Sequence, residues 1–203
     1  MTDALQSYRD DGPLAELLVN ATATRRLPWA LFTFLGSASL AAGLLLDRGD
    51  IGVWAVAGVA GFILLNATVR PEKRPLGWFT PPLLRVGEYG LFIVVAASST
   101  AQARPAVYAL LAAVAFHHYD LVYRLRHQNI TAPAWVRRAG LGWDGRMLVA
   151  IVLTATSTVT VGCLVFATWC AVIFVAESIR SWTALERPTG RAVVISTDED
   201  DEV

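Results

Sequence analysis

Acidic and basic side chains meet at four places in this otherwise apolar sequence, and these are the residues whose types could do chemistry. They are Arg85 with Glu88, the run of His117, His118, Tyr119, Asp120, Tyr123 and Arg124, then Asp144 with Arg146, and Glu177 with Arg180. Arginines make bidentate contacts with phosphate groups. Carboxylates bind Mg²⁺ or Mn²⁺, or act as general bases on a hydroxyl group. The combination predicts a polar cavity that holds a phosphorylated ligand.

The candidate site residues have three predicted roles. Substrate binding is assigned to Arg85, Tyr123, Arg124 and Arg146, catalysis to Glu88, His117 and Asp120, and metal binding to Asp120 and Asp144. The metal would be Mg²⁺ or Mn²⁺, bridging the phosphate of the ligand to the carboxylates. Within the densest group, the spacing of His117, Asp120 and Arg124 places all three on one face of a helix.

The two adjacent histidines argue against a haem or a histidine-rich metal site. His117 and His118 point about 100° apart on a helix, so we expect that they do not both face one centre. His127 is the third and last histidine of the chain.

A structural interpretation of the same charges stays open beside the functional one. Carboxylate–arginine pairs at helix ends also clamp neighbouring helices together, and arginines near a membrane surface extend to the headgroups. Arg85 with Glu88 and Glu177 with Arg180 fit this interpretation as well as they fit a site. The run from His117 to Arg124 is denser than helix packing requires, which favours function there.

Long apolar runs separate these charged groups and predict the elements that position them. Residues 29–46 and 51–69 carry no charge, a third run from 86 to 100 is interrupted only by Glu88, and a fourth extends from 105 to about 123. Runs of 18 or more residues are candidates for spanning a membrane. The uncharged stretch 147–176 is interpreted as two helices with a turn within 154–162, and a single tilted helix is the alternative. We therefore expect an all-α protein with six transmembrane helices.

The positive charges predict how these helices are oriented. With six spans and a cytosolic N-terminus, 15 of the 17 Lys and Arg residues fall on the cytosolic side, and only Arg48 and Arg104 fall outside. Such a bias is typical of multi-pass proteins of the plasma membrane. We expect a cytosolic segment at 1–28 that includes an interfacial helix, a membrane domain at 29–182 and a cytosolic acidic tail at 183–203. Both termini and all four charged groups would then face the cytosol.

Composition excludes several classes of protein. Hydrophobic residues make up 55% of the chain, charged residues 17%, and the formal net charge is zero. Charged residues make up roughly 25% of ordinary soluble domains. A disordered chain and a nucleic-acid-binding protein are therefore not expected. Cys163 and Cys170 are expected to be buried thiols.

Four segments in this order resemble a known family. They are PPLLRVGEYG at 81–90, AFHHYDLVYRLR at 115–126, GWDGRML at 142–148 and FVAESIRSW at 174–182. The chain resembles, over roughly residues 10–182, an actinobacterial membrane domain of unknown function that is often fused behind nucleotidyltransferase and CDP-alcohol phosphotransferase domains. The resemblance implies a setting in the synthesis of phospholipids or phosphodiester headgroups. The defining motif of the phosphotransferases, D-x2-D-G-x2-A-R followed by G-x3-D-x3-D, is absent. Only a loose, partial match to it remains, formed by Asp120, Arg124 and Asp144.

Three functions compete at this stage. One is a membrane enzyme, a metal-dependent transferase acting on a phosphorylated lipid or alcohol at the cytosolic face. Another is a non-catalytic module that assembles with a CDP-alcohol phosphotransferase, or with a second copy of itself, through small residues such as Gly43 and Gly61. The weakest is a small transporter, since no polar path crosses the outer leaflet. Membrane lipids are expected partners in each case.

Overall fold

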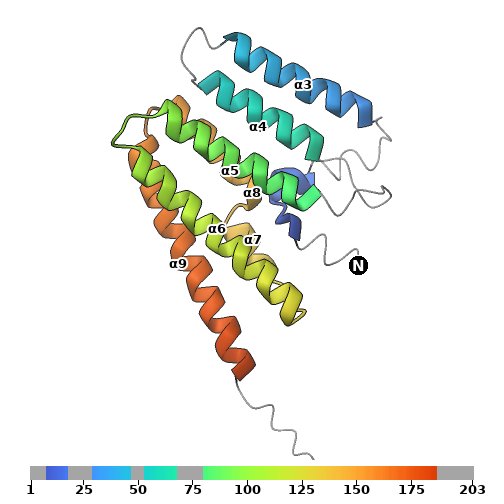
Figure 1. The fold of residues 1–203 in the computed structure, drawn as a ribbon, viewed down its shortest axis with the longest axis vertical. Helices are drawn as coiled ribbons and strands as arrows, with labels where there is room; N and C mark the ends of the chain where they lie inside the picture. The colour runs from blue at the N-terminus through green and yellow to red at the C-terminus, as the bar shows by residue number, and fades with distance from the viewer. Residues whose placement is uncertain (1–7, 18–28, 47–52, 68–79, 187–203) are drawn as a thin grey trace, which may run out of the picture.

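The computed structural model describes residues 8–17, 29–46, 53–67 and 80–186, and all regular secondary structure in these ranges is helical. A short helical turn at 13–17 precedes seven labelled helices (Figure 1). These are α3 (Trp29–Leu46), α4 (Val53–Ala67), α5 (Thr80–Ser98), α6 (Arg104–His127), α7 (Ala134–Ala139), α8 (Gly142–Ala155) and α9 (Val159–Glu186). The all-α prediction is confirmed.

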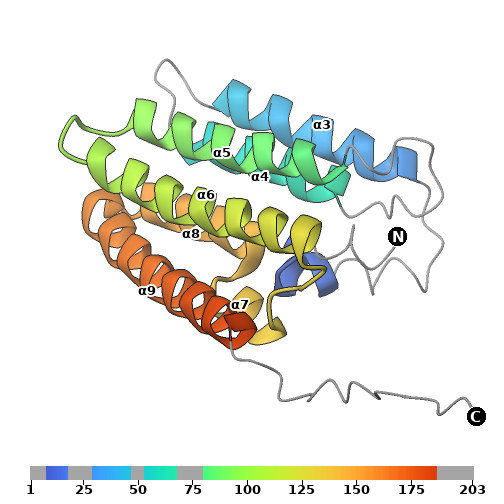
Figure 2. The same cartoon turned by 60° about the horizontal axis from the view of Figure 1, so that its bottom comes forward.

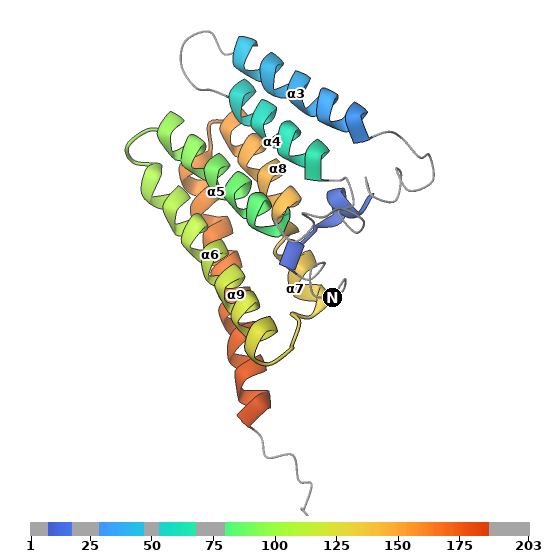
Figure 3. The same cartoon turned by 45° about the vertical axis from the view of Figure 1, so that its right-hand side comes forward.

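The helices form two pairs joined by a central group. α3 packs on α4 and α6 packs on α9, while α4, α5 and α8 contact one another between these pairs. Figure 2 shows α6 and α9 running side by side, and Figure 3 shows α4, α5 and α8 with similar directions. The fold therefore brings the charged residues of α5, α6 and α8 to one end of the central group.

Small residues explain the close packing of α3 on α4. A Cβ atom on Gly43 would overlap the carbonyl oxygen of Trp54, and one on Gly61 would lie 2.8 Å from Ser39 Oγ. Ser39 Oγ also lies 3.3 Å from the Gly58 carbonyl oxygen, to which it donates a hydrogen bond. The sequence analysis considered Gly43 and Gly61 as contacts for assembly with a partner. In the structure they allow close packing of two helices within the chain.

The stretch 147–176 consists of two helices, as predicted. α8 ends at Ala155 and α9 begins at Val159. The turn between them places Ser157 at a φ of +54°, in the left-handed region, and the Thr158 N–H donates a hydrogen bond to the Leu153 carbonyl. Gly162 lets α9 pass close to α8, because a Cβ atom there would overlap the Leu153 side chain.

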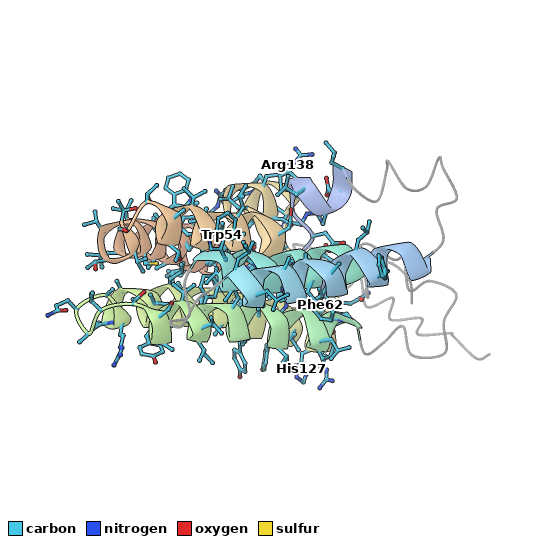
Figure 4. The ribbon with its side chains drawn as sticks, turned by 90° about the horizontal axis from the view of Figure 1, so that it is seen from above. Trp54, Phe62, His127 and Arg138 are labelled. Atoms are coloured by element: carbon cyan, nitrogen blue, oxygen red, sulfur yellow. The ribbon has the colours of Figure 1, made fainter. Side chains whose placement is uncertain are left out.

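The apolar core lies where the central helices meet α6 and α9. Its fully buried side chains include Leu91, Phe92, Val107, Leu110, Trp143 and Phe174, contributed by α5, α6, α8 and α9. Side chains on the outside point away from this core. In Figure 4, for example, His127 at the end of α6 and Arg138 on α7 project from opposite sides of the molecule, and Trp54 and Phe62 mark α4.

Two of the described helices are long and apolar enough to cross a membrane, namely Arg104–His127 and Val159–Ala184. The sequence analysis expected six. α3 and α4 contribute shorter apolar stretches, Phe34–Gly43 and Trp54–Ile63. α8 has 14 residues, and α5 carries Arg85 and Glu88 in its first half. Six spans and their orientation are therefore not established by helix length and composition.

Candidate functional site

The predicted site residues fall into two separate networks of buried charges. The first, called here the Arg146 cluster, comprises Asp10, Arg85, Glu88, His117, His118 and Arg146. The second, called the Arg124 clamp, comprises Asp120, Arg124, Glu177, Ser181 and Trp182. The sequence analysis expected one cavity, and the structure shows two polar networks in its place.

Arg146 holds the first network together from the start of α8. Its Nε atom donates to Glu88 Oε1 at 2.5 Å, and Nη2 donates to Asp10 Oδ2 at 2.8 Å. Nη1 donates to the Gly140 carbonyl oxygen at 3.2 Å. The Arg146 and Glu88 side chains are buried. One guanidinium thus joins α5, α8 and the segment around Asp10.

Both histidines face this cluster, which corrects the expectation that they could not share a centre. His118 Nε2 lies 3.4 Å from Asp10 Oδ2, and His117 Nε2 lies 3.8 Å from Asp10 Oδ1. The two oxygens of one carboxylate meet the two diverging rings separately, which the sequence spacing alone did not anticipate. His118 Nδ1 is also 2.8 Å from the hydroxyl of Tyr89, and the His117 ring stacks on Phe174.

Residues 8–17, called here the N-terminal segment, complete the cluster and were missed as site residues. Besides Asp10, the Tyr8 carbonyl oxygen accepts a hydrogen bond from Arg85 Nη2 at 2.6 Å. Asp11 accepts one from Trp143 Nε1 at 2.8 Å. The signal in the sequence is the run Asp10-Asp11-Gly12-Pro13, two carboxylates at a turn. The sequence analysis placed the segment in the cytosol and assigned it no partner.

Asp144, a predicted metal ligand, caps the short helical turn of this segment. Its two carboxylate oxygens accept hydrogen bonds from the backbone N–H groups of Gly12, Leu14 and Ala15 at 2.5, 2.7 and 3.0 Å. A side-chain acceptor at the start of a helical turn satisfies N–H groups that have no intrahelical partner. The contact is so close that a Cβ atom on Gly12 would overlap the Leu141 carbonyl oxygen.

The charge on Asp10 is set by its neighbours. Burial alone would raise the pKa of this carboxyl, but the charge of Arg146 and the neighbouring His117 and His118 rings outweigh burial and hold the pKa well below its usual value. Asp10 is therefore ionised at neutral pH. Together with Glu88 it balances the charges of Arg85 and Arg146.

The Arg124 clamp joins α6 to α9. Arg124 Nη1 and Nη2 donate to the two carboxylate oxygens of Glu177 at 2.7 and 2.8 Å, a bidentate pair. Asp120 Oδ2 lies 2.7 Å from Arg124 Nη2 as an ion pair outside hydrogen-bond geometry. Ser181 Oγ donates to Glu177, and Trp182 Nε1 donates to Asp120. The buried guanidinium thus pairs with one carboxylate from each helix, so this network holds two carboxylates for one arginine.

The remaining predicted residues are not brought into one site. Tyr123 is 39% exposed, and its ring lies beside those of His127 and Trp182. Asp120 and Asp144 belong to different networks, and their oxygens are taken by Arg124 and by backbone N–H groups. In the part of the chain that the structure describes, no three His, Cys, Asp or Glu side chains are grouped to hold a metal ion. This donor set does not fit the predicted Mg²⁺ or Mn²⁺ site.

Comparison with known sequences places the chain in a family. It matches the family of unknown function DUF5941 over residues 1–197. The chain belongs to that family. No curated protein and no solved structure matches it. The resemblance to a domain of unknown function is confirmed, and the DUF5941 match includes the N-terminal segment and both networks.

Proposed function

We propose that this chain is a multi-pass protein of the plasma membrane, with six spans and both termini in the cytosol. α9 supports membrane insertion, because only 28% of its apolar 18-residue stretch is buried inside the protein. The core helix of a soluble protein is mostly buried. The outer face of α9 carries Val161, Val165, Trp169 and Val172, each more than half exposed. In water such a large apolar surface would be costly. The 15-to-2 distribution of Lys and Arg supports the orientation.

Within this membrane protein, we propose that the chain is a non-catalytic module, in which the buried charges pair with one another while the N-terminal segment is in place. The observation that carries this proposal is that the buried arginines and carboxylates pair with one another. Arg146 is paired with Asp10 and Glu88, and Arg124 with Glu177 and Asp120. Asp144 is occupied by backbone donors. A catalytic centre of the predicted kind needs a carboxylate or an arginine that is available to a ligand.

The setting implied by the family resemblance gives this module a partner, a CDP-alcohol phosphotransferase in the same membrane. The exposed face of α9 offers an apolar surface that a membrane helix can pack against. The module would anchor or stabilise the partner enzyme without taking part in the chemistry.

Two measurements test the module against an enzyme. Co-expression with a CDP-alcohol phosphotransferase, followed by affinity purification in mild detergent, is expected to recover a complex. Thermal unfolding of the purified chain with CDP, CMP, CDP-diacylglycerol or inositol phosphate, each with and without Mg²⁺ or Mn²⁺, is expected to show no metal-dependent stabilisation. A monomer that recovers no partner, or stabilisation that requires the metal and is lost in Asp120→Ala, would contradict the module.

An enzyme acting on a phosphorylated substrate is the second candidate. The observation that favours it concerns the carboxylate of Asp10, which comes from the N-terminal segment and not from one of the long helices. Around it lie Arg85, Arg146, His117 and His118. The hydroxyl of Tyr89 on His118 adds a group that can move a proton. Transfer of the phosphatidyl group from CDP-diacylglycerol to a hydroxyl of inositol phosphate by the purified wild type, with release of CMP, would favour this candidate if it is lost in Tyr89→Phe.

A further inference from the structure

Asp10 is bound in the way that an anionic ligand is bound. Its carboxylate is 2.8 Å from Arg146 Nη2, and it lies 3.4 and 3.8 Å from the Nε2 atoms of His118 and His117. Next to it, Arg85 Nη2 donates to the Tyr8 carbonyl oxygen. The donors come from α5, α6 and α8, whereas both acceptors come from the N-terminal segment.

The backbone that delivers Asp10 is strained. Asp10 has a φ of +52°, and Leu141 and Gly142, against which the segment packs, have φ values of +64° and +61°. Non-glycine residues rarely adopt this left-handed region, and such conformations persist only where surrounding contacts impose them. The strain at Asp10 is relieved when the segment leaves, which favours a segment that can be displaced.

We propose that Arg85, Arg146, His117 and His118 form a binding site for a phosphate-class oxyanion, and that Asp10 occupies this site as a displaceable internal ligand. A guanidinium accepts a carboxylate and a phosphate by the same hydrogen-bond geometry. Withdrawal of the N-terminal segment leaves two arginines against Glu88, so the site gains one uncompensated positive charge. The His117 and His118 rings, whose Nε2 atoms face Asp10, are the other polar groups that the phosphate oxygens would meet.

Glu88 has a positioning role in this site. It binds Arg146 Nε at 2.5 Å and Arg85 Nη1 at 3.3 Å, so it orients both guanidinium groups whether Asp10 is present or not. The proposal needs no metal ion and does not depend on the module or the enzyme function, because it concerns only what competes with Asp10.

The first test follows the N-terminal segment in the full-length wild type. Hydrogen exchange is measured in detergent at increasing concentrations of inorganic phosphate, with chloride at equal ionic strength as the reference. Competition predicts that phosphate increases the exchange of residues 8–17 and leaves the exchange of α9 unchanged. Equal exchange of residues 8–17 in phosphate and chloride would overturn the proposal, without any variant being needed.

The second test displaces the segment without changing a charge. In Gly12→Ala the added Cβ atom would overlap the Leu141 carbonyl oxygen and press on Asp144. Gly90→Ala is the matched control, since its Cβ atom would have no heavy atom within 4 Å. Phosphate binds only to molecules whose N-terminal segment has left the site, so its apparent dissociation constant is the intrinsic one divided by the fraction of such molecules. We therefore expect about tenfold tighter phosphate binding in Gly12→Ala than in Gly90→Ala. Equal affinities would overturn the proposal.

A third comparison locates the binding and identifies its source. Arg85→Gln, a partly exposed member of the site, is expected to weaken phosphate binding in the Gly12→Ala background. Unchanged affinity would place the phosphate elsewhere and overturn the assignment. Reconstitution into phosphatidylcholine vesicles, with and without phosphatidic acid, separates a lipid headgroup from a free phosphate. Exchange of residues 8–17 that rises with phosphatidic acid indicates the headgroup, and exchange that rises only with soluble phosphate indicates a free anion.

Discussion

At the residue scale, Arg124 shows why the charges of this protein come in compensated groups. The guanidinium is fully buried between α6 and α9, and Glu177 and Asp120 neutralise it from the two helices. Burying such a charge is tolerated only when partners replace its hydration. Removing one partner is therefore more costly than replacing the whole group.

Glu177→Gln is expected to destabilise the protein strongly, because Arg124 keeps its charge and loses its bidentate partner. Breaking a buried pair from one side costs about 3 to 5 kcal/mol when no other partner remains. Asp120 stays beside Arg124 in this variant, so we expect a loss at the lower end of that range. Denaturant unfolding in detergent measures the change. Glu16→Gln is the control, since Glu16 pairs with Arg137 at the surface, where a loss of under about 1 kcal/mol is expected. Equal losses in the two variants would contradict a structural clamp.

The pH dependence of the N-terminal segment follows from Asp10. Its pKa is held well below the ordinary value in the folded state. The ionised carboxylate therefore stabilises docking above the unfolded value of about 4, and this stability is lost as the pH falls toward the folded pKa. The protection of residues 8–17, measured relative to the intrinsic exchange rate at each pH, should be flat above about pH 5 and fall below it.

The charged groups that face Asp10 are Arg146, His117 and His118. Because Glu88 is a second carboxylate paired with Arg146, Asp10→Asn isolates the contribution of Asp10. The protection of residues 8–17 in this variant should be lower at neutral pH and should change less on acidification. An identical pH profile in wild type and Asp10→Asn would show that another group controls docking.

At the scale of elements, the α8–α9 turn offers a direct test of local strain. Ser157 is exposed and has a φ of +54°, a conformation that glycine adopts at little cost. Ser157→Gly is expected to raise stability by up to about 1 kcal/mol, measured by thermal unfolding. Ser157→Ala keeps the strain and should bring no gain. A loss of stability in the glycine variant would show that the turn is not strained in this way.

The helices could be predicted from the sequence, whereas the partners of the charged residues could not. The apolar runs predicted α3, α4 and α6 closely, whereas α5 begins at Thr80, before the expected run, and α7 was not predicted. The hydroxyl-rich residues around Thr156 indicated the turn in the stretch 147–176. Helical spacing predicted that Asp120 and Arg124 share a face. It gave no information on which residues of other helices meet them.

The N-terminal segment escaped sequence analysis for a physical reason. Its contacts with Arg146 and Asp144 join residues more than 120 positions apart. Periodicity reports only which residues share a face of one element, so it cannot reveal an irregular segment that inserts among helices. The acidic turn at Asp10 and Asp11 was visible, but its partners were not.

At the scale of the whole molecule, the fold determines which turns lie at the same end of the helix bundle. The turn between α5 and α6, around Gln102, and the turn between α8 and α9, around Ser157, lie at the same end of the bundle (Figure 1). The residues after α6, around Asn129, lie toward the other end, with α7 (Figure 3). The proposed orientation places the first two outside the cell and the third in the cytosol.

Cysteine labelling in intact cells tests this orientation, and with it the proposal of a membrane protein whose charged networks face the cytosol. The positions are Gln102→Cys, Ser157→Cys and Asn129→Cys, all exposed, in a chain whose native Cys163 and Cys170 are buried. A membrane-impermeant maleimide is expected to label positions 102 and 157 in intact cells, and position 129 only after the membrane is permeabilised. Labelling of position 129 in intact cells, or of all three positions only after permeabilisation, would contradict the account.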